Sequence, residues 1–349
     1  MFWPLSRSSG ANKDIAESDN KALRLFKVRR TYAEQPLHLF DKPSRWYAAS
    51  PDSVRDFSAA CYHFGKQLQE TLDMPIGLIQ AASGGTVITS WAPIQSRAAR
   101  AEMNWRTEPR NQPTVLFNGM ISPITPYGMR GVVFYQGESD TRKPDGYGLA
   151  LTDLIRSWRE MFRQNLEFQI VQLANYGEPS SVTANSRWAR LREEQRKAAD
   201  DELNTQLVVT IDLGEGNNIH PSDKRSVGKR IALSALGSTY GREGVFLSPT
   251  YRAHVTIGNT IRIDFDNTGT GLSTRNEDAV IGFAVCATER RCRPVKAKIN
   301  GASVEITLRK GESPAWIRYG WAGNPNVNLY NSAGLPTGPF QINLNQQEQ

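Results

Sequence analysis

At 349 residues the chain can bury a substantial core, and its length predicts one large domain with a smaller one, or two comparable ones. The net charge is +7, but Lys and Arg are scattered along the chain without a basic tract, which disfavours nucleic-acid binding and leaves a mildly basic surface suited to anionic glycans. No apolar run approaches the roughly 18 residues of a membrane span, and Met1–Leu5 is too short for the core of a signal peptide.

The first elements are a strand and a helix. Leu23–Val28 is rich in apolar residues and predicts a strand. Ser50 followed by Pro51 is typical of a helix start. Apolar residues then recur at three- and four-residue spacing as far as Leu72. The pattern predicts one amphipathic helix whose apolar stripe packs onto a sheet.

The next strand is expected at Ile76–Gln80, and it runs into Gly84 and Gly85. Two glycines after a buried strand allow backbone amides to approach a ligand closely, although a structural tight turn explains them equally well. Asn118 lies in a Pro-containing loop further along the chain. Its side chain could bind a ligand or simply make a turn before Gly119.

A short β-branched and aromatic run, Val132–Tyr135, predicts a strand buried on both faces of a parallel sheet. It stops abruptly at Gln136-Gly137-Glu138. The carboxyl ends of strands border the ligand crevice in open α/β sheets, so an amide, a glycine and a carboxylate are well placed there to meet a substrate. A helix-capping turn is the alternative explanation.

Helix and strand patterns continue to alternate, as is typical of a three-layer α/β sandwich with a parallel sheet. His220 follows the last of these strands in a polar, glycine-rich loop, on the same predicted sheet edge as Glu138. A lone His is often structural, but this position favours a catalytic one. Helices are expected at Tyr147–Phe162, Trp188–Ala198 and Asp223–Leu236, and strands at Phe168–Leu173 and Gln206–Leu213.

From about Ser248 the pattern changes to the alternation of antiparallel strands, expected at Ile261–Phe265, Val280–Val285, Val295–Ile299 and Val304–Leu308. We therefore expect an α/β domain over 1–247 and a β-rich lobe over 248–349. Cys286 and Cys292 are spaced so that they could pair across a hairpin, and a disulfide there would imply an oxidising compartment. Three separated Cys and four His form no ligand-spaced cluster, so no metal site is expected.

One predicted sheet edge thus collects most of the groups that ester hydrolysis needs. His220 can be the general base and Glu138 the acid that orients it. The Gly85 N–H and the side chains of Gln136 and Asn118 are candidates for the oxyanion hole. No nucleophile is apparent.

Several long segments resemble sialate O-acetylesterases of the SGNH hydrolase superfamily, in nearly collinear order over the whole chain. They are Phe2–Leu5, Asp56–Gly65, Gly77–Trp91, Leu116–Ile124, Gly131–Asp140, Ile219–Pro221, Ile317–Ala322 and Asn328–Asn331. The resemblance implies a flavodoxin-like fold and a serine esterase that removes acetyl groups from sialic acid or related carbohydrates without a metal or cofactor.

In the resembled family the nucleophile lies in a Gly-Gln-Ser-Asn-Met motif just after the first sheet strand. The methionine of that motif corresponds to Met1, so the resemblance implies that the serine precedes this chain and that the first strand of the sheet is missing. Ser6, Ser8 and Ser9 are the nearest serines, but they fall in a polar loop without the turn that presents a nucleophile.

The orienting acid also departs from the superfamily pattern. The superfamily often has Asp three residues before the histidine, where this chain has Asn217. Related carbohydrate acetylesterases use the Glu of a Gln-Gly-Glu motif, which maps to Glu138. Asp212 is a weaker candidate, eight residues before His220.

Two other functions stay open. One is a non-catalytic carbohydrate-binding relative of the esterases. The other is glycoside hydrolysis by Glu138 with Asp140 or Asp212. The expected partner is an acetylated carbohydrate, with neither nucleic acid nor membrane, and the family's usual substrates together with the possible disulfide favour a periplasmic or extracellular location.

Overall fold

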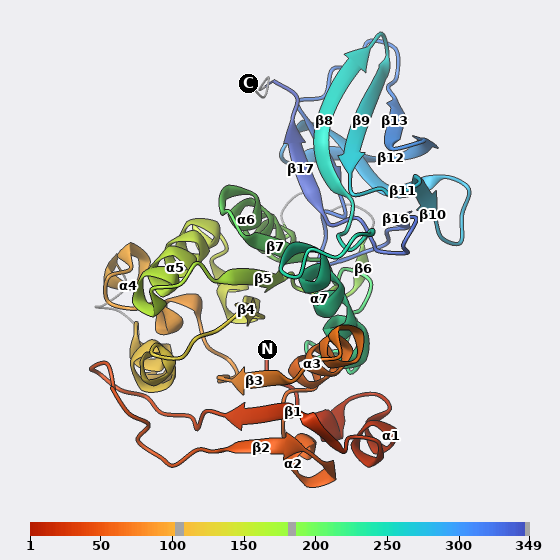
Figure 1. The fold of residues 1–349 in the computed structure, drawn as a ribbon. Helices are drawn as coiled ribbons and strands as arrows, with labels where there is room; N and C mark the ends of the chain where they lie inside the picture. The colour runs from red at the N-terminus through yellow and green to blue at the C-terminus, as the bar shows by residue number, and fades with distance from the viewer. Residues whose placement is uncertain (102–107, 181–185, 346–349) are drawn as a thin grey trace.

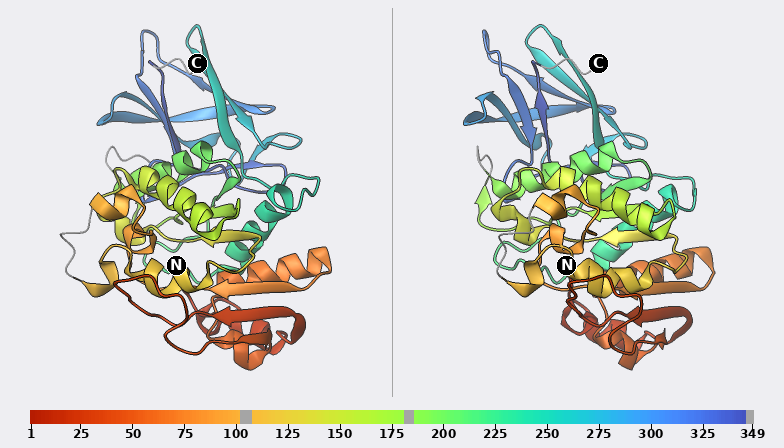
Figure 2. Two further views of the ribbon diagram at one scale, coloured as in Figure 1. Left: turned by 60° about the vertical axis from the view of Figure 1, so that its left-hand side comes forward. Right: turned by 90° about the vertical axis from the view of Figure 1, so that its left-hand side faces the viewer.

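The computed structural model describes residues 1–101, 108–180 and 186–345. The earlier part of the chain forms an α/β layered structure, and the last third forms a β-rich lobe that stands on it (Figures 1 and 2). The two kinds of sheet agree with the predicted division of the sequence into an α/β part and an antiparallel part.

One half of the α/β sheet contains three strands in the order β2-β1-β3. β1 (Asn20–Lys27) pairs in parallel with β3 (Ile76–Gln80), from Leu23 opposite Ile76 to Lys27 opposite Gln80. β2 (Trp46–Ala49) adds an antiparallel edge strand. The first two predicted strands are therefore confirmed.

The single helix predicted after Ser50 is two helices in the structure, α2 and α3 (Pro51–Arg55 and Ala59–Leu72). The break lies where the N-terminal segment crosses it. The Leu5 N–H donates to the Phe57 carbonyl (3.0 Å), and the Ala59 N–H donates to the Trp3 carbonyl (2.9 Å). Because these backbone groups bond to a distant segment, they cannot continue a helical ladder.

The other half of the sheet contains three parallel strands in the order β4-β5-β7 (Gly131–Phe134, Glu167–Val171 and Thr205–Val208). The three predicted helices near these strands are confirmed as α5, α6 and α7 (Tyr147–Phe162, Arg187–Asp201 and Lys224–Ser238). The α/β part also contains two shorter helices, α1 and α4 (Ala11–Ala16 and Arg97–Ala101). Helices α3 and α7 pack together on one face of the sheet, and α5 and α6 pack together on the other (Figure 1), which makes three layers.

Strand β7 ends at Val208, earlier than the predicted Leu213. The Thr210 hydroxyl donates to the Gln172 carbonyl (2.6 Å), and the Leu213 N–H closes a turn onto the Thr210 carbonyl (3.0 Å). The chain therefore leaves the sheet before it reaches Asp212.

The two halves of the sheet do not pair with each other. β3 and β4 face one another across a cavity of about 470 Å³, and every residue of both strands lines it. We call this cavity the slot. Its other walls are mainly apolar side chains from α3 and from the opposite layer, such as Phe64, Leu68, Trp91 and Ile121. The N-terminus lies between the two half-sheets, and Met1 lines the slot (Figure 1).

The β-rich lobe is built on seven antiparallel strands in the order β17-β14-β11-β12-β13-β9-β8 (Phe340–Asn343, Trp316–Tyr319, Val280–Thr288, Arg291–Asn300, Ser303–Thr307, Thr260–Asp266 and Thr250–Ile257). The four strands predicted there are confirmed. Short pairs add β10 with β16 (Leu272–Thr274 and Leu329–Asn331) and β6 with β15 (Pro179–Ser180 and Asn324–Pro325).

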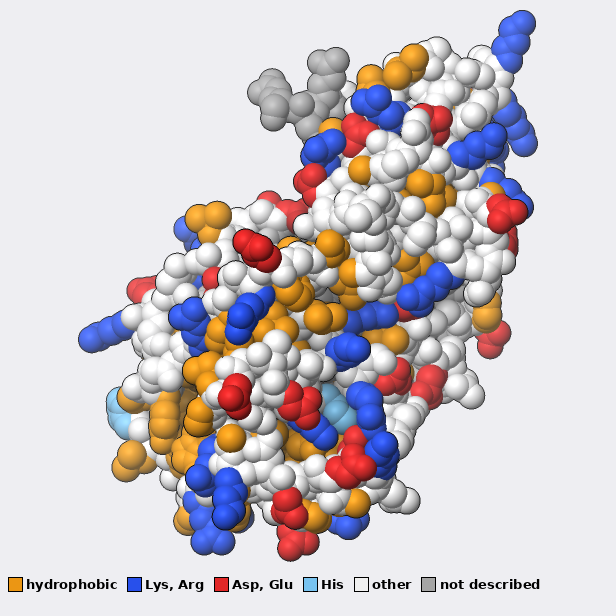
Figure 3. Space-filling model, turned by 45° about the vertical axis from the view of Figure 1, so that its right-hand side comes forward, with side chains coloured by type: hydrophobic (Ala, Val, Ile, Leu, Met, Phe, Trp, Pro, Cys, Tyr) orange, Lys and Arg blue, Asp and Glu red, His pale blue; other side chains and the backbone are white. Residues whose placement is uncertain are grey.

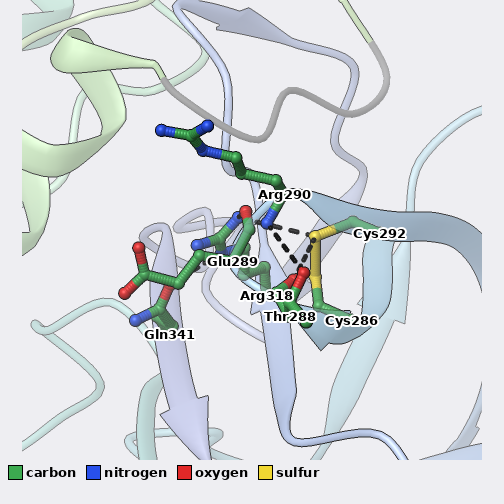
Figure 4. The surroundings of a disulfide bond; sticks show 7 residues. All are labelled: Cys286, Thr288, Glu289, Arg290, Cys292, Arg318 and Gln341. Atoms are coloured by element: carbon green, nitrogen blue, oxygen red, sulfur yellow. Dashed lines mark hydrogen bonds between the residues drawn. A yellow bond between two sulfur atoms is a disulfide. The ribbon is translucent and has the colours of Figure 1, made fainter.

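Cys286 and Cys292, whose pairing the sequence left open, form a disulfide that joins the paired strands β11 and β12 (Figure 4). The Cα atoms are 4.0 Å apart. Beside it, the Arg318 guanidinium donates to the Glu289 carbonyl (2.9 Å).

None of the helices in the described ranges is long and apolar enough to cross a bilayer. On the face shown in Figure 3, the basic side chains are interspersed with acidic and uncharged ones.

Arg192 of α6 joins the two parts of the molecule. Its buried guanidinium donates to the Leu173 and Ala174 carbonyls after β5, and to the Ala322 and Gly323 carbonyls of the β-rich lobe, at 2.6 to 2.8 Å. Burial lowers the pKa of Arg192 to about 9. Four backbone acceptors from two segments are thereby satisfied by one side chain.

Candidate active site

Glu138 and His220 come from two loops at the carboxyl ends of β4 and β7. Glu138 begins a short 3-10 turn, Glu138–Arg142, four residues after β4 ends. His220 lies in the loop that leads into α7. The carboxylate of Glu138 acts to raise the pKa of His220, so the two side chains are electrostatically coupled. The predicted sheet edge thus brings these two residues together.

The carboxylate of Glu138 is not fully satisfied. Its Oε1 atom is buried and has no hydrogen-bond partner among the described residues. A buried carboxylate oxygen without a donor is costly, so such an atom is expected to gain a partner in the functional state. The same carboxylate acts to raise the pKa of the nearby Lys224.

Helix α6 fixes the turn that carries Glu138. Gly137 has φ +148°, and a Cβ atom there would lie 2.8 Å from Leu191 Cδ2 and 3.3 Å from Gln195 Nε2. Gln195 donates to the Gln136 carbonyl (3.1 Å) and accepts from the Leu173 N–H (3.0 Å). A larger residue would be strained by the positive φ and would have to displace the Leu191 side chain, so glycine is favoured where the chain passes against the helix.

Glu215 organises the loop that carries His220. Its carboxylate accepts from the Ser222 N–H (2.6 Å), the Ser222 hydroxyl (2.7 Å) and the Asn218 amide (2.9 Å). The Asn218 side chain in turn accepts from the His220 N–H (3.0 Å). Hydrogen bonds from Ser222 hold the pKa of Glu215 below its usual range. The loop is therefore clamped on both sides of His220.

The imidazole of His220 stacks on Trp3, with ring centroids 5.4 Å apart and an angle of 16° between the planes. Burial lowers the pKa of His220, and the Lys224 ammonium lowers it further, against the opposing effect of Glu138. A lowered pKa keeps the imidazole neutral near pH 7, the state that a general base needs. No hydrogen bond of the ring to another described residue is present.

Lys224 is buried beside these residues. Its ammonium lies 3.1 Å from Met1 Sδ and 3.5 Å from the Tyr135 hydroxyl. Burial lowers the pKa of Lys224 to about 8. Lys224 thus places a cation close to both His220 and Glu138.

Gln136 connects the loops that follow β3 and β4. Its amide donates to the Thr86 carbonyl (3.0 Å) and to Asp140 Oδ2 (2.5 Å), and its Oε1 accepts from the Tyr147 hydroxyl (2.9 Å). Gln136 thus holds the glycine turn beside its own strand end. Within that turn Gly85 is exposed with φ +70°, and no described residue accepts a hydrogen bond from its N–H.

Asn118 is buried, and its amide donates to the Ala33 carbonyl (3.1 Å), the Glu34 carbonyl (3.0 Å) and the Thr114 hydroxyl (3.1 Å). These bonds hold the loop after β1 against the 117–121 segment. Both Asn118 and Gln136 therefore give their amide hydrogens to protein acceptors in this structure, and only the Gly85 N–H is uncommitted among the three predicted oxyanion donors.

The remaining candidates from the sequence lie as follows. Asp212 accepts two hydrogen bonds from Arg230 (2.5 and 2.8 Å) and one from Tyr330 (3.3 Å). Ser8 donates to the Leu5 carbonyl (2.8 Å), and the Ser9 hydroxyl bonds that of Ser222 (2.8 Å). Asn217 and Ser6 are exposed. Asp212 is thus committed to an ion pair rather than to His220.

The family model of "carbohydrate esterase, sialic acid-specific acetylesterase" matches residues 9–237. The chain belongs to this family. The sialate O-acetylesterases of Pongo abelii and Homo sapiens are each 28% identical to it, over 94% and 92% of this chain and 70% and 68% of theirs. A carbohydrate acetylesterase from Xanthomonas citri has a similar structure, with a TM-score of 0.90 and 33% identity over 99% of this chain and 78% of that one.

The sequence pattern did not indicate several residues that shape the site of this acetylesterase-family chain. Glu215, Lys224 and Gln195 were not singled out, and Trp3 appeared only as part of a family segment. A carboxylate between glycines, shortly before His220, was a usable signal for Glu215, because such loops need a side-chain acceptor for their free N–H groups. The contacts of Trp3 and Gln195 join segments far apart in the chain, so no local pattern predicts them.

Proposed function

We propose that this member of the family is a carbohydrate O-acetylesterase that removes acetyl groups from sialic acid or related sugars by a Ser-His-Glu mechanism of the SGNH type. The observation that carries the proposal is the electrostatic interaction of Glu138 with His220, on loops that follow β4 and β7. Gln136, two residues before Glu138, is bonded to Thr86 in the turn that contains Gly85 (3.0 Å). Family membership and the similar acetylesterase structure support the reaction class.

In the proposed reaction a serine hydroxyl attacks the acetyl carbonyl while His220 removes its proton. Glu138 orients the imidazole and stabilises the imidazolium, and its unpartnered Oε1 is the atom available for that bond. His220 then protonates the departing sugar oxygen, and a water molecule activated by the same base releases acetate. The Gly85 N–H stabilises the oxyanion. Gln136 and Asn118 would join it only by exchanging a protein acceptor for the substrate.

The nucleophile is proposed to arrive on an additional parallel strand in the slot. The facing edges of β3 and β4 expose unpaired backbone groups, and such edges are stabilised when another strand pairs with them. The slot is largely apolar, and Tyr135 and Gln136, which lead from β4 into the Glu138 turn, are among its lining residues. A strand that runs through it and connects to Met1 would present the next turn of the chain to His220.

Two expression forms test this proposal. The coding sequence upstream of Met1 is read, and any in-frame segment is added to the chain. The extended protein is expected to hydrolyse an aryl acetate and an O-acetylated sialic acid, and His220→Ala or Glu138→Gln should each reduce the rate by at least about a hundredfold. The exposed Asn217→Ala serves as a control that keeps activity.

Absence of hydrolysis by the extended protein, together with retained binding of an acetylated sugar, would establish the non-catalytic alternative. Glycoside hydrolysis finds little support, because Asp140 and Asp212 are already bonded to other protein groups.

A periplasmic or extracellular location is proposed from the family's substrates and the Cys286–Cys292 disulfide, which suits an oxidising compartment.

A further inference from the structure

A second cavity, of about 410 Å³, lies where the loop after β7 meets the β-rich lobe. Ligand sites commonly occupy volumes of this order, on the scale of roughly 300–1,000 Å³. We call it the junction pocket, and its polar wall is formed by Asp212, Arg275, Asn276, Glu277, Asn326 and Tyr330. It differs from the slot, whose walls are mainly apolar.

The two acidic side chains of the junction pocket have cationic partners. Asp212 forms a two-pronged ion pair with Arg230 and accepts a further hydrogen bond from the Tyr330 hydroxyl (3.3 Å). Glu277 lies 4.0 Å from Lys296. Their negative charges are therefore partly offset before any ligand enters.

Arg275 lacks such a partner. Its guanidinium stacks on the Tyr330 ring, 3.8 Å from the centroid, and one nitrogen donates to the Gly334 carbonyl (3.0 Å). The Arg275 N–H is fixed to the Asn328 carbonyl (3.1 Å). No described carboxylate forms an ion pair with Arg275, and the remaining guanidinium N–H groups have no acceptor among the described residues. The cation is exposed to solvent, held by the ring and by one hydrogen bond to Gly334, and its other N–H groups can bind a ligand.

Asn276 and Asn326 lie on the same wall, and neither side chain bonds to another described residue. Amides that can both donate and accept suit the hydroxyl groups of a sugar. A guanidinium edge suits a carboxylate, because its parallel N–H groups form two hydrogen bonds at once. A ligand that carries both hydroxyls and a carboxylate matches this arrangement.

We propose that the junction pocket binds the carboxylate-bearing sugar unit of an acidic saccharide, with Arg275 as the carboxylate ligand. This inference rests on the proposed function for its connection to turnover, since the loop from Asp212 to His220 joins the pocket to the candidate active site. The pocket selects acidic glycans by charge, at a place separate from the reacting ester.

Binding is measured with the 349-residue chain, by isothermal titration calorimetry at low salt. The probes are sialyllactose, a glucuronate-containing disaccharide and lactose. We expect at least one acidic probe to bind and lactose to bind at least tenfold more weakly. Arg275→Gln should weaken acidic binding at least tenfold, and Arg275→Lys should restore only part of it. The control Arg252→Gln removes an exposed arginine of β8 and should change nothing.

A second variant, Asn326→Asp, introduces a negative charge without removing the Arg275–Tyr330 stack, and should also weaken binding of the acidic probe. Equal binding of lactose, binding unaffected by both variants, or no binding of either acidic probe would overturn the proposal. Because these readouts need no turnover, failure here is distinct from failure of the extended protein to hydrolyse an acetate ester.

Discussion

The carboxylate of Glu215 determines how the His220 loop is held, and its protonation should loosen that loop. Hydrogen bonds from Ser222 depress the pKa of Glu215 in the folded protein, so the ionised form contributes stability above the unfolded pKa of about 4.3. That contribution should disappear as pH falls through the lower, folded pKa. We expect Glu215→Gln to lower the free energy of unfolding by about 1–2 kcal/mol at pH 7.

Thermal unfolding of both proteins from pH 7 to pH 3 tests this prediction. The difference between them should narrow below about pH 4. The exposed Glu243 provides the control, because Glu243→Gln should leave the curve in place. A constant difference across the range would mean that the carboxylate charge of Glu215 does not hold the loop.

Gly137 combines a positive φ with close contacts to α6, so a side chain there should be poorly tolerated. Gly137→Ala should cost about 1–3 kcal/mol through the contact with Leu191 and the left-handed φ, and it should displace Glu138. Gly146 also has a positive φ, +81°, but no atom would lie within 4 Å of an added Cβ. Urea unfolding should therefore show a larger loss for Gly137→Ala than for Gly146→Ala, and equal losses would contradict the close approach to α6.

At the scale of elements, the sequence was sufficient wherever one local pattern decides the structure. The periodicity from Tyr147 to Phe162 matches α5, and the four alternating runs of the last third became strands. The local sequence pattern gave the wrong bounds where contacts with a distant segment determine where an element ends. The gap between α2 and α3 depends on backbone bonds from Trp3 and Leu5, and the early end of β7 depends on the Thr210 bond to Gln172.

The candidate site follows the same distinction. Strand ends predicted that Glu138, His220 and Gly85 would lie on one edge, because parallel strands expose their carboxyl ends together. The bonding of the Gln136 and Asn118 amides could not be predicted, since their acceptors are carbonyls of separate loops. The roles of all these residues in the reaction stay predictions until activity is measured.

The Cys286–Cys292 disulfide should stabilise the β11–β12 hairpin. A short closed loop of this kind contributes about 2 kcal/mol in the chain-entropy model. The double variant Cys286→Ser, Cys292→Ser should melt at a lower temperature than the oxidised protein. Dithiothreitol should lower the melting temperature of the parent protein alone, and an equal effect on the double variant would show that the reductant acts elsewhere.

At the scale of the whole molecule, Arg192 should couple the α/β part to the β-rich lobe. Arg192→Met removes a donor from four carbonyls. Those of Ala174 and Gly323 keep a second donor, from Trp188 and Tyr176, but no other described residue donates to those of Leu173 and Ala322. We therefore expect the free energy of unfolding to fall by at least about 2 kcal/mol. Calorimetry should show one transition in the parent and two in the variant. The control Arg187→Met changes an exposed arginine on the same helix and should keep one transition. A single transition in both variants would place the coupling in other contacts.

The slot between β3 and β4 has a mechanical consequence. Internal voids make a folded protein occupy more volume than its unfolded chain in water, and unfolding volumes of roughly −20 to −100 mL/mol scale with them. The slot has a volume of about 470 Å³ and mainly apolar walls, so the part of it that water does not fill should make the fold more sensitive to hydrostatic pressure. Insertion of a strand that fills this space would make the same fold stiffer and less compressible.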